Sequence, residues 1–111
     1  MPEKIKPRMH RRIPIATELN FTGDVDGAGV LLEMSEGGLS FSTHVRCETG
    51  QYIRLRLQDE EESFFVEGNL VSVNAEGDGL RCGLAFSSMP ASALLSVRAF
   101  LKRHQFSRFR V

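Results

Sequence analysis

Two groups of side chains in this sequence have the types and spacing needed to bind an anionic ligand. The first lies near the N-terminus, where Arg8 and Arg12 are four residues apart and Arg11 adds a further cation. Arginine pairs bidentately with phosphate, and its planar guanidinium also stacks on nucleobases. This group therefore indicates a ligand that carries phosphates or bases.

The second group follows a segment of strand-like sequence. It consists of the polar pair Glu33 and Ser35 and of the Gly37-Gly38 turn that comes after them. A carboxylate accepts hydrogen bonds, a hydroxyl donates or accepts them, and glycine lets the backbone turn tightly and approach a ligand. Each group alone is a weak signal. Their order along the chain, with the arginines just ahead of a predicted strand, favours one joint binding site.

The charges of the chain are divided between its ends and its centre. Lys and Arg number 14, as do Asp and Glu, so the formal net charge is zero. Residues 1–12 carry +4 and residues 102–111 carry +4, whereas residues 13–101, with five Arg against thirteen acids, carry −8. Basic ends on an acidic body favour an anionic ligand held by the ends. The alternative is that the basic tails only aid solubility.

The sequence contains no recognisable catalytic constellation. The histidines His10, His44 and His104 have no carboxylate or nucleophile at a meaningful spacing, so surface positions are the simpler interpretation. Nucleophile-elbow, zinc-protease and P-loop motifs are absent. The Gly37-Gly38 turn precedes a strand, so it cannot direct a helix N-terminus at a phosphate. We therefore expect a binding protein with no enzymatic activity and no cofactor.

The cysteines Cys47 and Cys82 lie far apart in the sequence and form no CxxC pair, which excludes the usual zinc spacings and predicts no metal site. Cys82 lies in an apolar strand pattern and is expected in the core. No apolar run approaches the ~18 residues of a membrane span, and the N-terminus lacks the apolar region of a secretion signal. We expect a cytoplasmic protein without a membrane span, and no disulfide in that reducing compartment.

The elements that must position these residues follow from hydrophobic periodicity. A chain of 111 residues supports one domain with one core. Period-2 patterns predict six strands, over residues 12–22, 29–35, 39–42, 52–58, 63–74 and 80–87. An apolar stripe of Leu94, Val97 and Leu101, with Leu95 beside it, predicts a helix over residues 90–104 that docks on the strands. The fold class is therefore all-β dominated, a six-stranded antiparallel β-barrel with a C-terminal α-helix.

Three local expectations accompany this architecture. The strand over residues 63–74 has apolar residues of both parities, which predicts a bulge near Gly68 or burial on both faces. The acidic segment 59–62 is expected to be a solvated hairpin end. Residues 1–12 are interpreted as a flexible basic arm, residues 13–105 as the barrel plus helix, and residues 106–111 as a basic tail.

At this point the sequence resembles the PilZ domain, a family of bacterial cyclic di-GMP receptors marked by RxxxR in an N-terminal arm and (D/N)xSxxG between the second and third strands. The segment from Cys82 to Phe86, followed by a helix, is also similar to the end of a PilZ barrel, and the resemblance covers about residues 7 to 105. It implies a six-stranded barrel and cyclic di-GMP as the ligand. The ligand-binding residues that it implies are Arg8, Arg12, Glu33, Ser35 and Gly38, with Arg11 and Gly37 secondary.

The residue chemistry fits this ligand, which offers two phosphates and two guanines. Arginine recognises phosphate and the O6/N7 edge of guanine. The Glu33 carboxylate can accept guanine N–H donors, and the Ser35 hydroxyl can bond a base edge or a phosphate. We expect the arm to become ordered when the ligand binds, at a cost in affinity.

Two departures from the family pattern bear on the ligand. Glu33 stands where the family prefers Asp or Asn, so its oxygens reach about 1.5 Å further, roughly one bond length. The extra reach weakens binding or lets Glu33 pair with Arg8 or Arg12. Pro7 stands where family members that bind a stacked ligand dimer have a further arginine, which predicts one ligand molecule.

Three functions remain open from the sequence. The leading one is a receptor or adaptor that converts the cyclic di-GMP level into an altered protein–protein interaction, with a protein partner that the sequence does not identify. The second is a protein-interaction module whose degenerate pocket binds no nucleotide, motivated by Glu33. The third is a nucleic-acid-binding small barrel, motivated by the basic ends with Phe106 and Phe109 and opposed by the −8 body. The sequence does not select among motility, exopolysaccharide synthesis and virulence as the downstream process.

Overall fold

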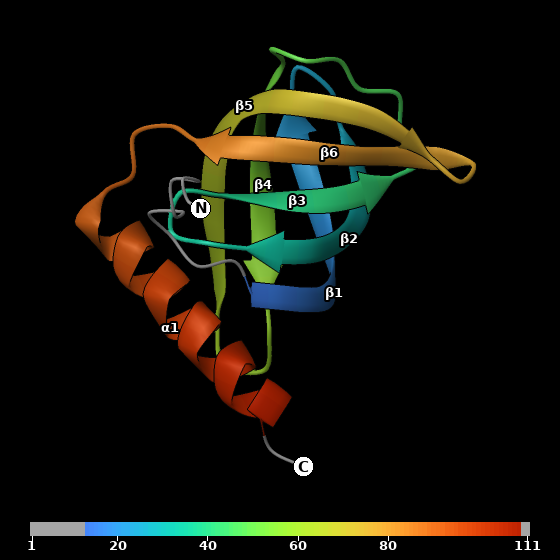
Figure 1. The fold of residues 1–111 in the computed structure, drawn as a ribbon. Helices are drawn as coiled ribbons and strands as arrows, with labels where there is room; N and C mark the ends of the chain where they lie inside the picture. The colour runs from blue at the N-terminus through green and yellow to red at the C-terminus, as the bar shows by residue number, and fades with distance from the viewer. Residues whose placement is uncertain (1–12, 110–111) are drawn as a thin grey trace, which may run out of the picture.

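The chain folds into six strands followed by one helix, and the computed structural model describes residues 13–109 (Figure 1). The elements are β1 (Ile13–Gly23), β2 (Gly27–Met34), β3 (Gly38–Thr43), β4 (Tyr52–Gln58), β5 (Ser63–Glu76), β6 (Gly79–Phe86) and α1 (Ala91–Phe109). The strands form a closed antiparallel barrel in the order β1-β2-β3-β6-β5-β4. The predicted six-stranded barrel with a C-terminal helix is confirmed.

Alternation along the strands builds the core inside this barrel. In β4 the side chains of Ile53, Leu55 and Leu57 are fully buried, while Arg54 and Arg56 are exposed. Phe21 of β1 and Phe41 of β3 meet across the interior with ring centroids 5.4 Å apart. The barrel closes because β1 pairs with both β2 and β4, so neither β1 nor β4 is left as a sheet edge.

Strand β5 contains the predicted irregularity in its pairing with β6. The register shifts between Leu70 and Ser72, beginning two residues after Gly68. Val71 is the residue between them, and it is 59% exposed. Because of the extra residue both Val71 and Ser72 face outward, and Val73 turns toward the core against which it packs, so the apolar residues change parity within this segment.

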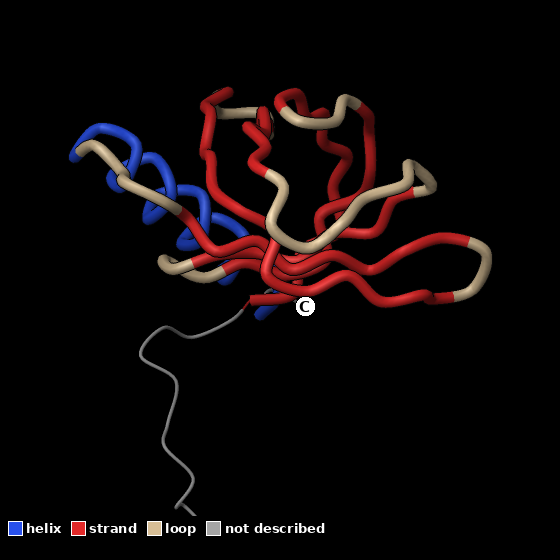
Figure 2. Tube along the Cα trace, turned by 90° about the horizontal axis from the view of Figure 1, so that it is seen from above, coloured by secondary structure: helices blue, strands red, loops and turns tan. Residues whose placement is uncertain are grey.

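The helix α1 lies along one side of the barrel (Figure 2). Val97 and Leu101 of the predicted stripe are buried, and Phe100 is also buried, edge-on to Phe64 of β5 at 5.5 Å. Leu95, placed with the stripe by the sequence, is 64% exposed, so that assignment was wrong. The helix continues to Phe109, five residues beyond the predicted end. Among the described residues, no helix is both long enough and apolar enough to cross a membrane.

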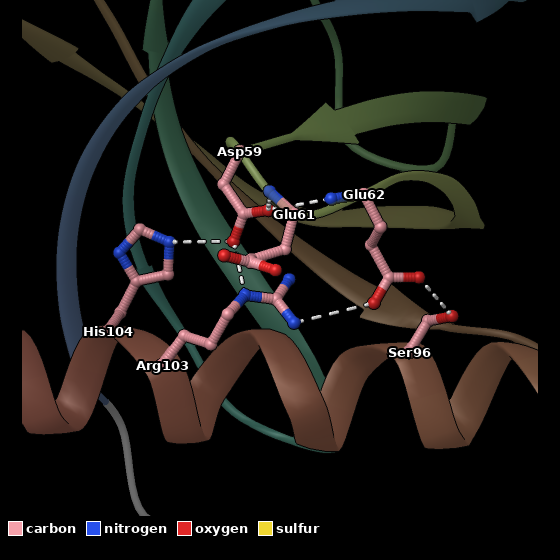
Figure 3. Close-up of polar contacts among 6 residues, drawn as sticks. All are labelled: Asp59, Glu61, Glu62, Ser96, Arg103 and His104. Atoms are coloured by element: carbon pink, nitrogen blue, oxygen red, sulfur yellow. Dashed lines mark hydrogen bonds and ion pairs between the residues drawn. The ribbon is translucent and has the colours of Figure 1, made fainter.

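The acidic segment is the hairpin end between β4 and β5, as predicted, but it is only partly solvated. Glu60 and Glu61 are exposed, whereas Asp59 and Glu62 dock on α1 (Figure 3). Arg103 Nε donates a hydrogen bond to Asp59 Oδ2 at 2.7 Å, and the Asp59 side chain is only 13% exposed. Arg103 Nη1 lies 3.5 Å from Glu62 Oε1, and Ser96 Oγ donates to Glu62 Oε2 at 2.9 Å. One cation of the basic C-terminal end therefore fixes the helix to the barrel.

Candidate functional site

An open cavity of about 310 Å³ lies on the outer face of the barrel, where β2, β3, β5 and β6 adjoin. Its lining combines one acid, one base, small polar groups and several glycines. The residues are Glu33, Gly37, Gly38, Ser40, Val71, Ser72, Asn74, Arg81, Cys82, Gly83, Leu84 and Ala85. The structure thus brings the predicted residues Glu33, Gly37 and Gly38 together at one cavity.

A bulge in β2 directs Glu33 to this cavity. The register of β2 against β3 shifts between Leu31 and Glu33. Leu31 and Met34 are both fully buried although they are three residues apart, a spacing that a regular strand would place on opposite faces. The additional residue restores Met34 to the core and leaves Glu33 on the outer face, opposite Ser40 of β3.

The carboxylate of Glu33 is the centre of a small polar network. Arg81 Nη2 donates to Glu33 Oε2 at 3.1 Å, and Ser40 Oγ donates to the same oxygen at 3.4 Å. Arg81 Nη2 also lies 3.4 Å from Ser40 Oγ, and Arg81 Nη1 lies 3.9 Å from Glu76 Oε2. The side chains of Glu33 and Arg81 are 30% and 41% exposed, so a ligand in the cavity could reach both.

Arg81 was not among the predicted site residues. Its outward direction follows from the alternation with buried Cys82, but its closeness to Glu33 depends on β3 and β6 being neighbours in the barrel. The sequence suggested Arg8 or Arg12 as partners for Glu33. Arg8, Arg11 and Arg12 lie outside the described residues, and within the described part of the chain the ionic partner of Glu33 is Arg81.

Ser35 forms the turn beside the cavity and does not line it. Its backbone N–H donates to the carbonyl of Gly38 at 2.8 Å, and its hydroxyl accepts from the backbone N–H of Gly37 at 3.1 Å. The hydroxyl also lies 3.4 Å from the carbonyl oxygen of Gly38, and the residue is 4% exposed. In this structure the Ser35 side chain therefore shapes the turn that presents Gly37 and Gly38.

Two glycines that line the cavity let neighbouring strands approach each other closely. A Cβ atom on Gly38 would lie 2.3 Å from the carbonyl oxygen of Leu84, so β3 can approach β6 here only without a side chain. The φ angle of Gly38 is not positive, so close approach is the reason for glycine here, not a left-handed turn. A Cβ on Gly83, a lining residue that the sequence interpretation did not single out, would lie 2.5 Å from Ser72 Oγ.

The N-terminal end of β1 pairs with the part of β2 that holds the cavity residue Glu33. Pro14 pairs with Glu33, and Ile13 pairs with Met34. The segment that precedes Ile13 contains Arg8, Arg11 and Arg12, the cations that the sequence assigns to the ligand. The pairing register therefore ties the start of β1 to the residue at the centre of the polar network.

Other titratable groups of the described residues form their ionic contacts outside this cavity. Within residues 13–109, no group of three or more His, Cys, Asp or Glu side chains could hold a metal ion. His44 lies 3.8 Å from Asp78, and His104 lies 3.5 Å from Asp59. Cys47 and Cys82 are both buried and free, and burial together with the neighbouring Cys47 thiol raises the pKa of Cys82 to about 12.

Comparison with known proteins finds one family and one fold. The family model described as PilZ domain matches residues 6–103. No curated protein matches the chain. The PilZ domain of YcgR from Escherichia coli, solved with c-di-GMP, has a TM-score of 0.81 at 12% identity, with 93% of this chain and 95% of that chain covered.

Two further solved structures share the fold. The inhibitor of motility MotI/DgrA from Bacillus subtilis has a TM-score of 0.73 at 19% identity, with 99% of this chain and 58% of that chain covered. The chain thus spans little more than half the length of MotI. The PilZ domain of CeSA from a cellulose-synthesizing bacterium has a TM-score of 0.69 at 15% identity, with 86% of this chain and 98% of that chain covered. At these identities the likeness concerns the fold.

Proposed function

Because this chain belongs to the PilZ domain family, we propose that it is a receptor for cyclic di-GMP and that the outer cavity at Glu33 is the place where the ligand binds. The observation that carries the proposal is the pairing of Pro14 with Glu33. Two residues of chain extend at most about 7 Å, so Arg12 cannot start far from the cavity. This pairing supports the proposal that the two motifs, separate in the sequence, act on one surface.

The site would bind through complementary charge and shape. Arg8 and Arg12, with Arg11 secondary, supply cations for the two phosphates of the ligand. Glu33 accepts N–H donors of one guanine, while Gly37 and Gly38 let the ligand approach the backbone. Ser35 contributes chiefly by holding the turn through its bond from Gly37. This arrangement serves binding, so we propose a receptor or adaptor without catalytic activity.

The signalling step in this proposal is the ordering of residues 1–12. A ligand gripped by both the arm and the barrel draws the arm onto the surface around the cavity and changes what a protein partner meets there. Backbone ¹⁵N relaxation of the full chain tests this step. The amide order parameters of residues 8–12 should rise at saturating cyclic di-GMP, and unchanged values would refute the switch.

Isothermal titration calorimetry with cyclic di-GMP tests the receptor itself. We expect micromolar or tighter binding by the full chain. Arg12→Ala should lose one charge-assisted contact, on the order of 2 kcal/mol or about 30-fold in affinity. Arg46→Ala is the matched control, because Arg46 is an exposed arginine that does not line the cavity. Absence of binding by the parent chain would leave a protein-interaction module with a PilZ fold.

A further inference from the structure

Glu33 forms an ion pair with Arg81, a residue that belongs to neither sequence motif. Both side chains line the cavity, and their terminal groups are 3.1 Å apart. Among the residues lining this cavity, Arg81 is the one with a positive charge. It lies on β6, which contributes no residue to the two motifs.

The guanidinium of Arg81 is only partly engaged. Both of its hydrogen bonds, to Glu33 and to Ser40, use Nη2. Nη1 has a loose ionic contact of 3.9 Å with Glu76, and within residues 13–109 the Nε–H and Nη1–H groups of Arg81 donate no hydrogen bond. A side chain that is 41% exposed can present these donors to a ligand while it keeps its bond to Glu33.

The combination of a carboxylate and a guanidinium side by side matches one edge of guanine. That edge offers two adjacent donors, N1–H and N2–H, and next to them the acceptor O6. Glu33 supplies acceptors for the donors, and Arg81 supplies donors for O6. Adenine presents an amino donor where guanine has O6, so the donors of Arg81 would face another donor.

The length of Glu33 accounts for the pair. An aspartate at this position would be shorter by one carbon–carbon bond, about 1.5 Å, so with the backbone and Arg81 unchanged its oxygens would lie further from Arg81 than the 3.1 Å of Glu33. The contact also offsets the negative charge of Glu33, which would otherwise repel the phosphates of a nucleotide.

We propose that Glu33 and Arg81 act as one guanine-reading unit, in which Arg81 is a ligand-contacting residue that sets the preference for guanine over adenine. This inference rests on the proposed function, since it assigns the base specificity of the same site. Arg81 is a specificity residue here, whereas the proposed function assigns the phosphates to the arginines of residues 1–12.

The test compares cyclic di-GMP with cyclic di-AMP, which shares the phosphate ring and differs in the bases. Calorimetry on the full chain should find a preference for cyclic di-GMP. Arg81→Met should weaken cyclic di-GMP binding at least ~10-fold and change cyclic di-AMP binding little, so the selectivity falls. Arg81→Lys, which keeps the charge without the planar fork, should also lose most of the selectivity. Arg56→Met is the control, because Arg56 is exposed on β4 and does not line the cavity.

The outcomes separate this inference from the proposed function. If the parent chain binds neither nucleotide, the receptor assignment fails and the inference fails with it. If the parent binds cyclic di-GMP and Arg81→Met binds it equally or more tightly, only the inference is overturned. An equal loss for both nucleotides at unchanged selectivity also overturns it, because Arg81 would then act by charge alone. Thermal unfolding of each variant confirms that the barrel is intact, and Arg81→Lys keeps the test decisive if Arg81→Met unfolds.

Discussion

The hydroxyl oxygen of Ser35 accepts a hydrogen bond from the backbone N–H of Gly37 at 3.1 Å. The same residue, 4% exposed, donates its own N–H to the carbonyl of Gly38, so the turn between β2 and β3 closes on itself. The Ser35 hydroxyl is thus hydrogen-bonded to the backbone of its own turn. The edge of the cavity formed by Gly37 and Gly38 has its shape because Ser35 holds it.

Replacing Ser35 by alanine should therefore affect stability as well as binding. Ser35→Ala leaves the Gly37 N–H without its partner and should cost about 1 kcal/mol of unfolding free energy. Urea denaturation measures this cost. Ser87→Ala is the comparison, because the exposed Ser87 hydroxyl also bonds a backbone carbonyl, that of Glu67 at 3.3 Å. Equal small effects of the two substitutions would contradict the structural role of Ser35.

The two cavity glycines should respond differently to alanine. Gly38→Ala would place a methyl group against the backbone carbonyl of Leu84, which cannot move without parting β3 from β6, and should cost about 1–3 kcal/mol. Gly83→Ala meets the Ser72 hydroxyl, a side chain that can rotate, so the fold should persist with a smaller cavity. Thermal unfolding and cyclic di-GMP titration together distinguish the cases. A stable Gly38→Ala barrel would show that β3 and β6 leave room for a side chain at Gly38, which would contradict this close approach.

The contact of Asp59 with α1 should make the unfolding free energy depend on pH. Burial alone would raise the pKa of the Asp59 carboxyl, but the hydrogen bonds from Arg103 and from the backbone N–H groups of Glu62 and Glu61 outweigh it and lower the pKa. Because the folded value is depressed, the stabilisation is fully present above the unfolded pKa of about 3.9. It is lost as the pH falls through the lower folded value.

Asp59→Asn tests this linkage. The variant should lose about 2 kcal/mol at pH 7, where a charge-assisted bond is removed, and its stability should fall less than that of the parent between about pH 5 and pH 2. Urea denaturation across that range supplies the comparison. Glu60→Gln removes a charge from the same segment at an exposed position and should leave the curve of the parent nearly unchanged. A parallel pH profile for Asp59→Asn and the parent would refute the linkage.

The packing of α1 should depend on Phe100. This ring is fully buried and lies edge-on to Phe64. Phe100→Ala should lower the unfolding free energy by about 3–5 kcal/mol, whereas Leu95→Ala, at a 64% exposed position on the same helix, should change it by less than about 0.5 kcal/mol. Chemical denaturation gives both values. A large effect at Leu95 would mean that the helix docks through a different face.

The thiol of Cys82 should be inert in the folded protein. The residue is fully buried, and its pKa of about 12 keeps it protonated at neutral pH. Iodoacetamide at pH 8 should leave Cys82 unmodified until urea unfolds the barrel, as judged by mass spectrometry of the digested protein. Rapid labelling of Cys82 under native conditions would contradict its place in the core.

Much of the barrel could be predicted because each strand repeats the period of a half-buried sheet. In β4 the order Ile53, Arg54, Leu55, Arg56 alternates without exception, and the structure buries and exposes these residues in turn. The helix was harder, because Phe100 and Leu95 are both large apolar residues of the same 19-residue helix. Only the packing against Phe64 decides which of them faces the barrel.

The polar contacts could not be predicted, because they join residues that the closed barrel brings together. Glu33 and Arg81 are 48 positions apart in the sequence, and Asp59 and Arg103 are 44 apart. In both pairs, the sequence around one residue does not indicate which residue is its partner. The motif residues Glu33, Gly37 and Gly38 were identified from spacing, while Gly83 looked like an ordinary strand glycine until its neighbour Ser72 was placed.

The most direct test of the central claim is to follow the backbone amides of the full chain by ¹H–¹⁵N correlation spectroscopy during titration with cyclic di-GMP. The account predicts saturable shifts at Gly37, Gly38, Ser40 and Gly83, which line the cavity, and small shifts in β4 across the barrel. Absence of any shift up to about 1 mM ligand, which corresponds to binding weaker than about −4 kcal/mol, would contradict it. So would saturable shifts confined to α1 and the 59–62 segment.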